Sequence, residues 1–146
     1  MSESAVTKLK LLEGYKFCVE FDKGSLSELI VDETPPIGDG AGPDPIRLLS
    51  AAVGHCLSSS LVYALRMALV KIEHLETTVN LTTERNETGR LRVKDIGVQM
   101  NLHVDEENRK YLKDTRELKY ALEVFENYCT VTQSVRKGIN VKVNLV

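Results

Sequence analysis

The alternation of apolar and polar residues predicts strands near the start of the chain. In YKFCVEF (residues 15–21), aromatic and aliphatic side chains alternate with Lys16, Cys18 and Glu20, which is the period of a half-buried strand. Residues 9–20 therefore contain two short strands around the turn EGY. A third strand, SELIVDE (27–33), follows the turn signal DKGS. The pattern predicts a three-stranded meander with Cys18 on the face opposite to the aromatic residues.

A long apolar helix is predicted next, over residues 45–70. Its apolar positions form a broad band that nearly surrounds the helix, which indicates a central helix covered on several sides. It follows the loop TPPIGDGAGPDP (34–45), which holds all four prolines of the chain. Asp44 is placed to cap the helix and Pro45 to begin it. The loop is either a connector or a wall of an active site.

The second half of the chain returns to strands and then to helices. Residues 74–85 and 90–104 alternate with strand period, and the turn candidate NETG joins them. Residues 105–129 show helical spacing, 130–138 end in a glycine stop signal, and 139–146 alternate as a final strand. Because strands and helices are segregated, the fold class is α+β, in a single domain over residues 1–146.

Composition excludes several classes of function. The net charge is −2 with acids and bases mixed along the chain of 146 residues, so no basic surface for nucleic acid is expected. The apolar segment 46–70 contains Arg47, His55, Arg66 and the run of serines at 58–60, which argues against a membrane span. The first residues lack an apolar run of signal-peptide length. A soluble, cytoplasmic protein is expected.

The cysteines and histidines do not form a metal-binding motif. Three cysteines without a signal peptide do not indicate a secreted disulfide framework, and no CxxC spacing occurs. His55, His74 and His103 form no HExxH or HxH pattern. We therefore expect no metal and no cofactor.

Cys56 lies within AAVGHCLSSSLVYAL (51–65) and has two possible roles. Its neighbours on the same face of the predicted helix are Ala52, Val53, Ser59 and Ser60, which are mostly small. Small neighbours leave room either for the close approach of another element or for a pocket over the sulfur. In the first case the thiol is a buried core residue, and in the second it is a reagent.

Two segments of the sequence together resemble the family of osmotically inducible protein C and organic hydroperoxide resistance proteins (OsmC/Ohr). The segments are GPDPIRLLSAAVGHC and NYCTVTQSVRKGINVKV. The residues that match the first family motif are Gly42, Pro43, Pro45, Leu48, Leu49, Ala51, Ala52, Gly54 and Cys56. Those that match the second are Tyr128, Cys129, Val131, Ser134 and Val135.

The resemblance implies a two-cysteine thiol peroxidase that acts in oxidative stress defence. Cys56 matches the cysteine that attacks an organic hydroperoxide and becomes a sulfenic acid, and Cys129 matches the one that then forms the disulfide. An external thiol or dithiol would reduce this disulfide. The resemblance also implies an intertwined homodimer with active sites at the subunit interface.

The sequence departs from the family pattern at the residues that activate the cysteine. Family members use an arginine from the N-terminal strands, held by a glutamate near the start of the central helix. Here the first arginine is Arg47, and Ile46 occupies the position of the glutamate. Without a nearby cation a thiol stays mostly protonated at neutral pH.

Three residues are candidates to activate or position the thiols. Arg47 precedes Cys56 by nine residues, which places it on the opposite face of a straight helix. A kink near Gly54, or the partner subunit, would be needed to bring it close. Arg136 follows Cys129 by seven residues, and Glu33 could contact a cation from the loop.

The remaining residues near these motifs have weaker claims. Lys16 and Lys23 lie in the N-terminal strands but do not offer the bidentate geometry of arginine. His55 is expected to point away from Cys56. The departure leaves an alternative function open: a dimer of this fold with weak or no peroxidase activity that binds a small molecule or senses redox state.

Overall fold

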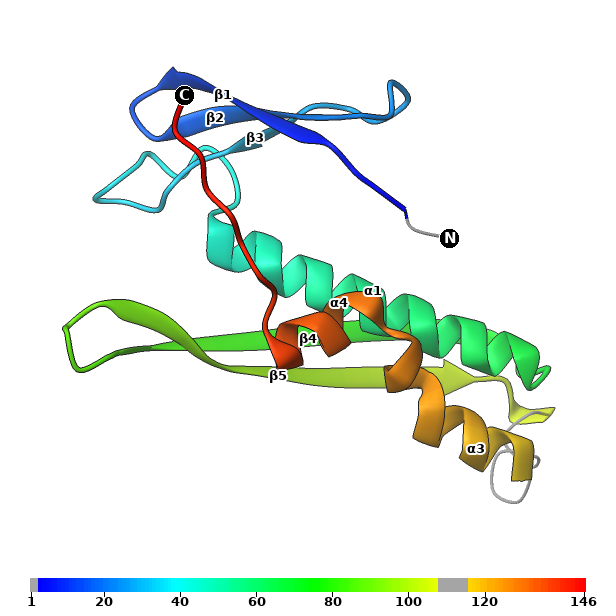
Figure 1. Cartoon of the computed structure of the whole chain (residues 1–146). Helices are drawn as coiled ribbons and strands as arrows, with labels where there is room; N and C mark the ends of the chain where they lie inside the picture. Colours follow the sequence, from blue (N-terminus) through cyan, green and yellow to red (C-terminus); the bar gives the residue numbers. More distant parts are fainter. Residues whose placement is uncertain (1–2, 108–115) are drawn as a thin grey trace. The chain divides into compact units, whose positions relative to one another are not determined.

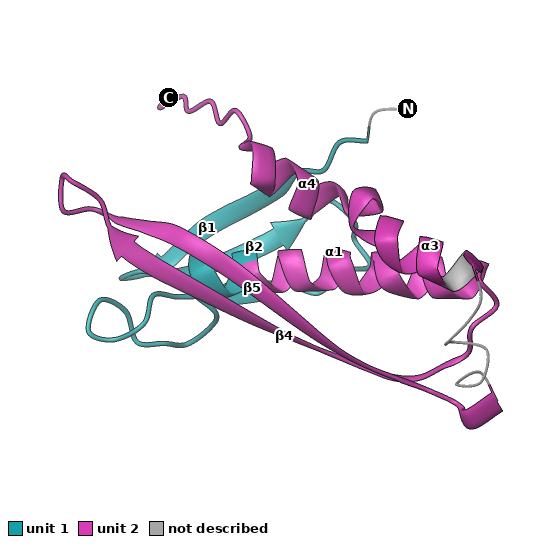
Figure 2. Ribbon diagram, turned by 90° about the horizontal axis from the view of Figure 1, so that it is seen from below, with its two compact units in different colours: residues 1–49 teal, residues 50–146 magenta. Residues whose placement is uncertain are grey.

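The computed structural model describes residues 3–107 and 116–146. The chain divides into two compact units, Met1–Leu49 and Ser50–Val146 (Figure 2), and the division falls within one long helix. The expectation of a single domain stays a prediction.

Unit 1 contains the predicted meander (Figure 1). Strands β1 (Thr7–Glu13), β2 (Lys16–Phe21) and β3 (Leu29–Val31) form an antiparallel sheet in the order β1-β2-β3. Cys18 in the central strand pairs with Lys10 on one side and Ile30 on the other. The third strand is shorter than predicted, because Asp32 and Glu33 already belong to the following loop.

The loop after β3 is organised by one buried carboxylate. Asp32 is 4% exposed and accepts hydrogen bonds from the backbone N–H groups of Glu33 (2.8 Å), Asp39 (3.1 Å) and Ala41 (3.1 Å). The bond from Ala41 contributes most to holding the pKa of Asp32 below its usual value, against the opposing effect of burial. Gly42 packs so closely on this loop that an added Cβ would lie 2.0 Å from the Ile30 carbonyl oxygen.

Helix α1 (Pro45–Met67) begins as predicted. The backbone N–H of Arg47 donates to the Asp44 carboxylate at 2.8 Å, so Asp44 caps the helix and Pro45 is its first residue. The helix ends three residues earlier than predicted. Leu69, just after it, takes a left-handed backbone conformation with φ 57°.

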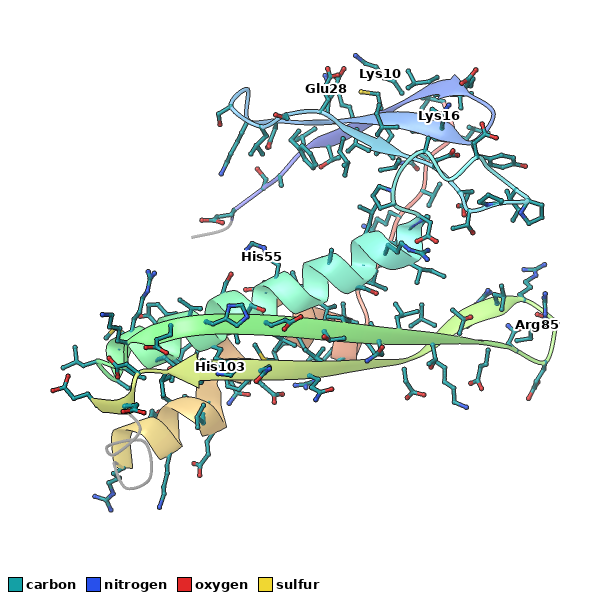
Figure 3. All side chains as sticks on the ribbon, turned by 180° about the vertical axis from the view of Figure 1, so that it is seen from behind. Lys10, Lys16, Glu28, His55, Arg85 and His103 are labelled. Carbon is teal, nitrogen blue, oxygen red and sulfur yellow. The ribbon has the colours of Figure 1, made fainter. Side chains whose placement is uncertain are left out.

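In unit 2, α1 runs along a long β-hairpin (Figures 1 and 2). Strands β4 (Ile72–Arg85) and β5 (Leu91–Val104) pair antiparallel over almost their whole length. The predicted NETG turn joins them: the Gly89 N–H donates to the Asn86 carbonyl at 2.8 Å. Arg85 donates to the Gly89 carbonyl at 2.6 Å and closes the tip of the hairpin (Figure 3).

The core of unit 2 lies between α1 and the hairpin. Leu61 and Leu65 are 3% and 0% exposed. The apolar residues packed against them come from the connection after α1, from the hairpin and from the C-terminal part, namely Val70, Ile72, Leu75, Met100, Leu102 and Phe125. By length and hydropathy α1 could cross a membrane. Leu61 and Leu65 of this helix lie buried in the core of unit 2.

Short helical segments follow the hairpin. They are α3 (Arg116–Val124), the 3₁₀ helix η1 (Phe125–Tyr128) and α4 (Thr130–Lys137). The helix predicted over 105–129 is thus observed in its C-terminal part, while its residues 108–115 lie outside the described residues. Gly138, with φ 76°, ends α4 as predicted.

The predicted final strand is wrong for this single chain. Residues 139–146 adopt no regular secondary structure, and the alternating residues Ile139, Val141, Val143 and Leu145 are 64% to 100% exposed. A strand forms only when a neighbouring strand accepts and donates its backbone hydrogen bonds. Among the described residues, this segment has no such neighbour.

Candidate functional site

Cys56 lies in the wall of a cavity in unit 2. The thiol is half-buried on α1 and borders a space of about 540 Å³, together with Tyr63, Tyr128 and Val131. The rings of Tyr63 and Tyr128 meet edge to face with their centroids 6.4 Å apart. The cavity therefore has mainly apolar walls and one reactive atom.

The small residues around Cys56 allow both the close approach of another element and a pocket, the two possibilities that the sequence left open. On one face of α1, Gly54 lies so close to β4 that an added Cβ would be 2.7 Å from Val79 Cγ2. On the same side the Ser58 hydroxyl bonds the Thr77 hydroxyl at 2.7 Å. On another face, Ala52, Ser59 and Ser60 border the cavity with Cys56. Close packing and a pocket thus occur on different sides of one helix.

Cys129 is fully buried at the start of α4. Its side chain occupies the N-cap position and accepts a hydrogen bond from the Thr132 N–H at 3.4 Å. The thiol also donates to Thr132 Oγ1 at 2.9 Å, and Thr132 itself is 7% exposed. Burial and two bonds to one residue fix the position of the sulfur.

The structure brings the two motif cysteines together. The thiols of Cys56 and Cys129 share a hydrogen bond, and both are free thiols. The two residues come from elements 73 positions apart in the sequence. The Cys56 residue borders the cavity, whereas Cys129 is buried at the N-terminus of α4.

The two thiols differ in acidity. Burial raises the pKa of Cys56, and the hydrogen bond with Cys129 raises it further. Burial also acts to raise the pKa of Cys129, but the bonds from Cys56 and Thr132 outweigh it and leave this pKa below its usual value. The hydrogen bonds around the pair therefore favour ionisation of Cys129 over ionisation of Cys56.

The arginines that were candidates to activate the thiols form ion pairs with carboxylates. Arg47 pairs with Asp44, and Arg136 Nη2 lies 2.7 Å from the Glu126 carboxylate. None of the dominant influences on the pKa of Cys56 or Cys129 comes from an arginine or lysine. Lys16 pairs with Glu13 at 2.7 Å. Glu33 lies in the Asp32 loop of unit 1, and its backbone N–H donates to Asp32.

His55, which was expected to point away from Cys56, lies at the surface. It is exposed on α1 (Figure 3), and it borders the same cavity as Cys56. Adjacent residues on a helix differ by about 100° in direction. That separation is small enough for both side chains to reach one wide opening.

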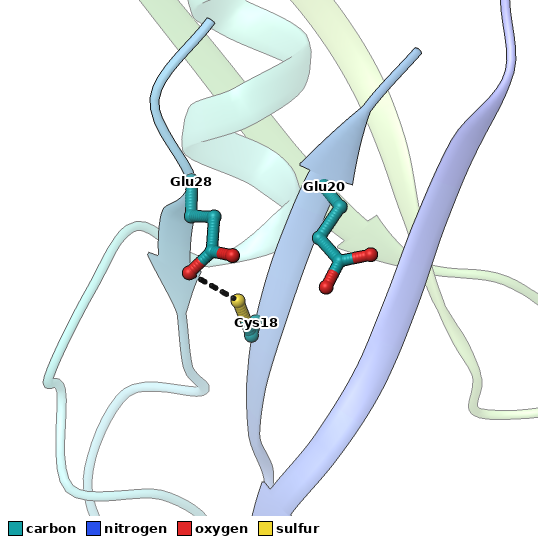
Figure 4. A group of neighbouring side chains, drawn as sticks. All are labelled: Cys18, Glu20 and Glu28. Atoms are coloured by element: carbon teal, nitrogen blue, oxygen red, sulfur yellow. Dashed lines mark hydrogen bonds between the residues drawn. The ribbon is translucent and has the colours of Figure 1, made fainter. Parts of the chain in front are cut away.

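The third cysteine lies in a different environment. On the sheet face that also carries Lys10 and Lys16 (Figure 3), possible ligand atoms of Cys18, Glu20 and Glu28 lie within 4.8 Å of one another (Figure 4). The Cys18 thiol donates to Glu28 at 3.4 Å, and Lys10 binds Glu20 at 2.5 Å. These bonds satisfy the three side chains within the sheet, so we assign them a structural role.

Sequence reasoning missed Thr132 and Tyr63. A threonine three residues after an N-cap is ordinary in a helix. Thr132 is of interest only because the N-cap residue that it hydrogen-bonds is a cysteine. Tyr63 follows Cys56 by seven residues, two helical turns later, which is a signal that it shares the face of Cys56. Asp32 gave no signal, because a loop acid is usually solvated.

A sequence model described as "OsmC-like protein" matches residues 38–144. The chain belongs to the OsmC-like family. Solved structures of the family agree with the fold. An OsmC-like protein from Mycoplasma pneumoniae superposes with a TM-score of 0.74 at 17% identity, covering 100% of this chain and 99% of that one. The predicted α+β class with the OsmC-like fold is therefore confirmed.

Other OsmC-like structures carry names that refer to hydroperoxides or to no known function. An organic hydroperoxide resistance protein from Elizabethkingia anophelis gives a TM-score of 0.65 at 19% identity, covering 93% of this chain and 90% of that one. An OsmC-like protein of unknown function from Vibrio cholerae gives 0.68 at 18%, covering 92% and 94%. No curated protein sequence matches significantly. At these identities the likeness shows the fold alone.

Proposed function

We propose that this OsmC-like protein is a thiol-dependent peroxidase that reduces organic hydroperoxides through Cys56 and Cys129. The observation that carries the proposal is the contact between two free thiols at the wall of a cavity. Cys56 faces the cavity and is accessible to substrate, whereas Cys129 is 0% exposed. Cys56 is therefore the nucleophile and Cys129 the resolving thiol.

The reaction proceeds in three steps. The Cys56 thiolate attacks the terminal oxygen of ROOH, the O–O bond breaks, and the alkoxide leaves and takes a proton to become ROH. Cys129 then attacks the sulfur of the Cys56 sulfenic acid, forming the disulfide and expelling hydroxide. An external thiol or dithiol supplies two electrons and two protons to restore both thiols.

The cavity suits an organic rather than an inorganic peroxide. Its walls include Tyr63, Tyr128 and Val131, and a second cavity of about 290 Å³ shares the two tyrosines. Apolar surface favours binding of a hydrocarbon substituent. The resistance proteins with the same fold bear names that refer to organic hydroperoxides.

The same proposal includes a homodimer in the cytoplasm. The C-terminal segment 139–146 presents an alternating apolar pattern without a partner strand, and every residue of β1 is exposed. A second copy of the chain would supply strands for these edges. Light scattering after gel filtration tests this: the full chain should be a dimer, and deletion of residues 139–146 should yield monomers or aggregates.

A second candidate function is supported by the acidity of Cys56. Burial raises the pKa of its thiol, and no arginine or lysine is a dominant influence on it. A slow thiol beside an apolar cavity fits a protein that binds a small molecule or senses redox state. This candidate retains the contact between the two thiols but requires no rapid turnover.

The deciding experiment is intact mass spectrometry with peptide mapping after one equivalent of cumene hydroperoxide is added to the reduced protein. We expect rapid loss of two hydrogens, mapped to a bridge between Cys56 and Cys129. The variant Cys18→Ser should behave identically, and Cys56→Ser should not react. Both thiols remaining alkylatable after minutes, in the unfolded protein, would exclude the peroxidase and leave the binding function.

A further inference from the structure

Two histidines lie opposite each other at the end of the long hairpin that is remote from its tip. His74 of β4 and His103 of β5, which is labelled in Figure 3, are partners in the antiparallel register. Their ring centroids are 5.9 Å apart, and both residues are exposed. Because they are 29 positions apart in the sequence, no motif of local spacing indicates the pair. The pairing of the strands brings them together.

A β-bulge sets the register at this point. Ile72 is paired with Val104, and the next pair along the ladder is His74 with His103. Glu73 is therefore an extra residue on β4. Without the bulge, regular pairing after Ile72 would place Glu73 opposite His103. The bulge instead places the two imidazoles at one pair of positions, where the Cβ atoms of opposite residues are about 5 Å apart.

The histidine pair lies on the face of the hairpin that is turned away from the core. The neighbouring pair, Leu75 and Leu102, packs against the buried leucines of α1. Because successive residues of a strand point to opposite faces, His74 and His103 point away from that core. Glu76 is the next residue of β4 on the outer face, and it is also exposed. Its carboxylate adds negative charge beside the imidazoles, which favours a cation there.

The separation of the rings fits two ligands of one metal ion. A neutral imidazole has one nitrogen with a free lone pair, and divalent transition metals prefer this ligand. Bonds of about 2.1 Å from one ion to a nitrogen of each ring leave the centroids about 5 to 6.5 Å apart, depending on the angle at the metal. The observed 5.9 Å lies within this range. Since both side chains are exposed, rotation about their single bonds can direct the two nitrogens to a common point.

We propose that His74 and His103 form a binding site for a divalent transition-metal ion of the kind represented by Zn²⁺ and Ni²⁺. Water and the Glu76 carboxylate are available for the remaining positions of the ion. Mg²⁺ and Ca²⁺ prefer oxygen ligands and do not suit a pair of imidazoles. The site uses no thiol, so it is independent of the proposed peroxidase function. Because its ligands come from two strands, the ion binds the folded chain and holds β4 and β5 together at this end.

Other residues of the chain are also possible metal ligands. In unit 1, ligand atoms of Cys18, Glu20 and Glu28 lie within 4.8 Å of one another, although a hydrogen bond and an ion pair already satisfy them. In unit 2, Cys56 and Cys129 are free thiols. An experiment on the histidine pair therefore has to locate the ion as well as detect it.

Isothermal titration calorimetry with Ni²⁺ measures the binding, with the thiols kept reduced. We expect one ion per chain in the wild-type protein, and paramagnetic broadening of the NMR signals of residues around the histidine pair. His74→Asn and His103→Asn should each abolish the binding, because a single imidazole forms no chelate. His55→Asn, at another exposed histidine of unit 2, should bind Ni²⁺ as the wild type does. Cys18→Ser and Cys56→Ser should do the same.

Urea denaturation with and without Ni²⁺ gives an independent measurement. An ion that binds only the folded chain stabilises it, so Ni²⁺ should raise the urea midpoint of the wild type but not that of His103→Asn. Without metal the two midpoints should be close, which shows that the variant is folded. A wild-type protein that binds no Ni²⁺ overturns the site, and so does binding that survives in both histidine variants. Binding that is lost in Cys18→Ser and kept in His103→Asn would place the ion on the sheet of unit 1.

Discussion

Cys18 in unit 1 and Cys129 in unit 2 are both buried thiols with a hydrogen-bond partner close by, yet their acidities are shifted in opposite directions. Cys18 is 8% exposed and donates to the carboxylate of Glu28, and burial together with this bond raises its pKa. Cys129 is 0% exposed but receives bonds from Cys56 and Thr132, and its pKa is lowered. Burial alone does not decide whether a thiol is reactive. The nature of the partner, acceptor or donor, decides it.

The largest expected effect is on peroxide turnover, when the cysteines are replaced one at a time. Cys56→Ser should reduce peroxide turnover with dithiothreitol to the background rate, because the nucleophile is lost. Cys18→Ser should keep turnover within about twofold of wild type, since a structural thiol contributes nothing to the chemistry. Steady-state peroxide consumption measures both. Equal loss in the two variants would place Cys18 in the reaction.

Removing the Cys129 side chain should destabilise the protein more than removing that of Cys18. Cys129→Ala leaves a cavity and removes the cap of α4, so we expect the free energy of unfolding to fall by about 1–3 kcal/mol. Urea denaturation measures this. Cys18→Ala should cost less, because its site is next to the surface of a sheet. A larger loss for Cys18→Ala would show that the sheet face is the more tightly packed site.

The pH dependence of stability should have opposite signs for the two thiols. The lowered pKa of Cys129 stabilises the fold above the usual thiol pKa of about 8.5, and this is lost as pH falls through the folded value. The raised pKa of Cys18 stabilises the fold below about 8.5, and this is lost as pH rises.

Urea denaturation from neutral to alkaline pH measures these effects. The stability of wild type relative to Cys129→Ser should increase toward pH 8.5, and relative to Cys18→Ser it should decrease above about pH 8.5. Parallel curves for the two variants would contradict the assignment of opposite shifts.

The smallest effects are expected at the arginines. Arg136→Gln removes an exposed pair with Glu126, and such pairs contribute about 1 kcal/mol or less. Arg47→Gln removes an exposed guanidinium from the buried carboxylate of Asp44. We expect turnover within about twofold of wild type in both variants. A tenfold reduction in turnover for Arg47→Gln alone would show that this arginine acts on Cys56 in the assembled protein.

The sequence predicted the elements of the fold well wherever the signals were local. The meander, the Asp44 cap, the NETG turn and the Gly138 stop all depend on a few neighbouring residues. The strand at 139–146 failed because its alternation specifies a face to be buried but not the partner that buries it. The end of β3 failed because the Asp32 carboxylate draws the following backbone into a loop.

The site was predictable in its residues but not in its chemistry. The motifs pointed to Cys56 and Cys129, and these residues do meet. The lowered pKa of Cys129 depends on its bonds with Cys56 and Thr132, and the bond with Cys56 forms only when α1 and the start of α4 lie side by side. The cavity wall likewise joins Tyr63 of α1 with Tyr128 of η1, which are 65 positions apart in the sequence.

The close approach at Gly54 has a mechanical consequence for the redox reaction. Only a residue without a side chain lets α1 rest against Val79, two positions before the thiol that faces the other way. A methyl group there would lift the helix off the hairpin and shift Cys56 with it. Disulfide bonding tolerates little displacement, since the two Cα atoms must stay within about 7 Å. The contact between Gly54 and the hairpin thus determines the position of Cys56, and with it the distance between the two sulfurs.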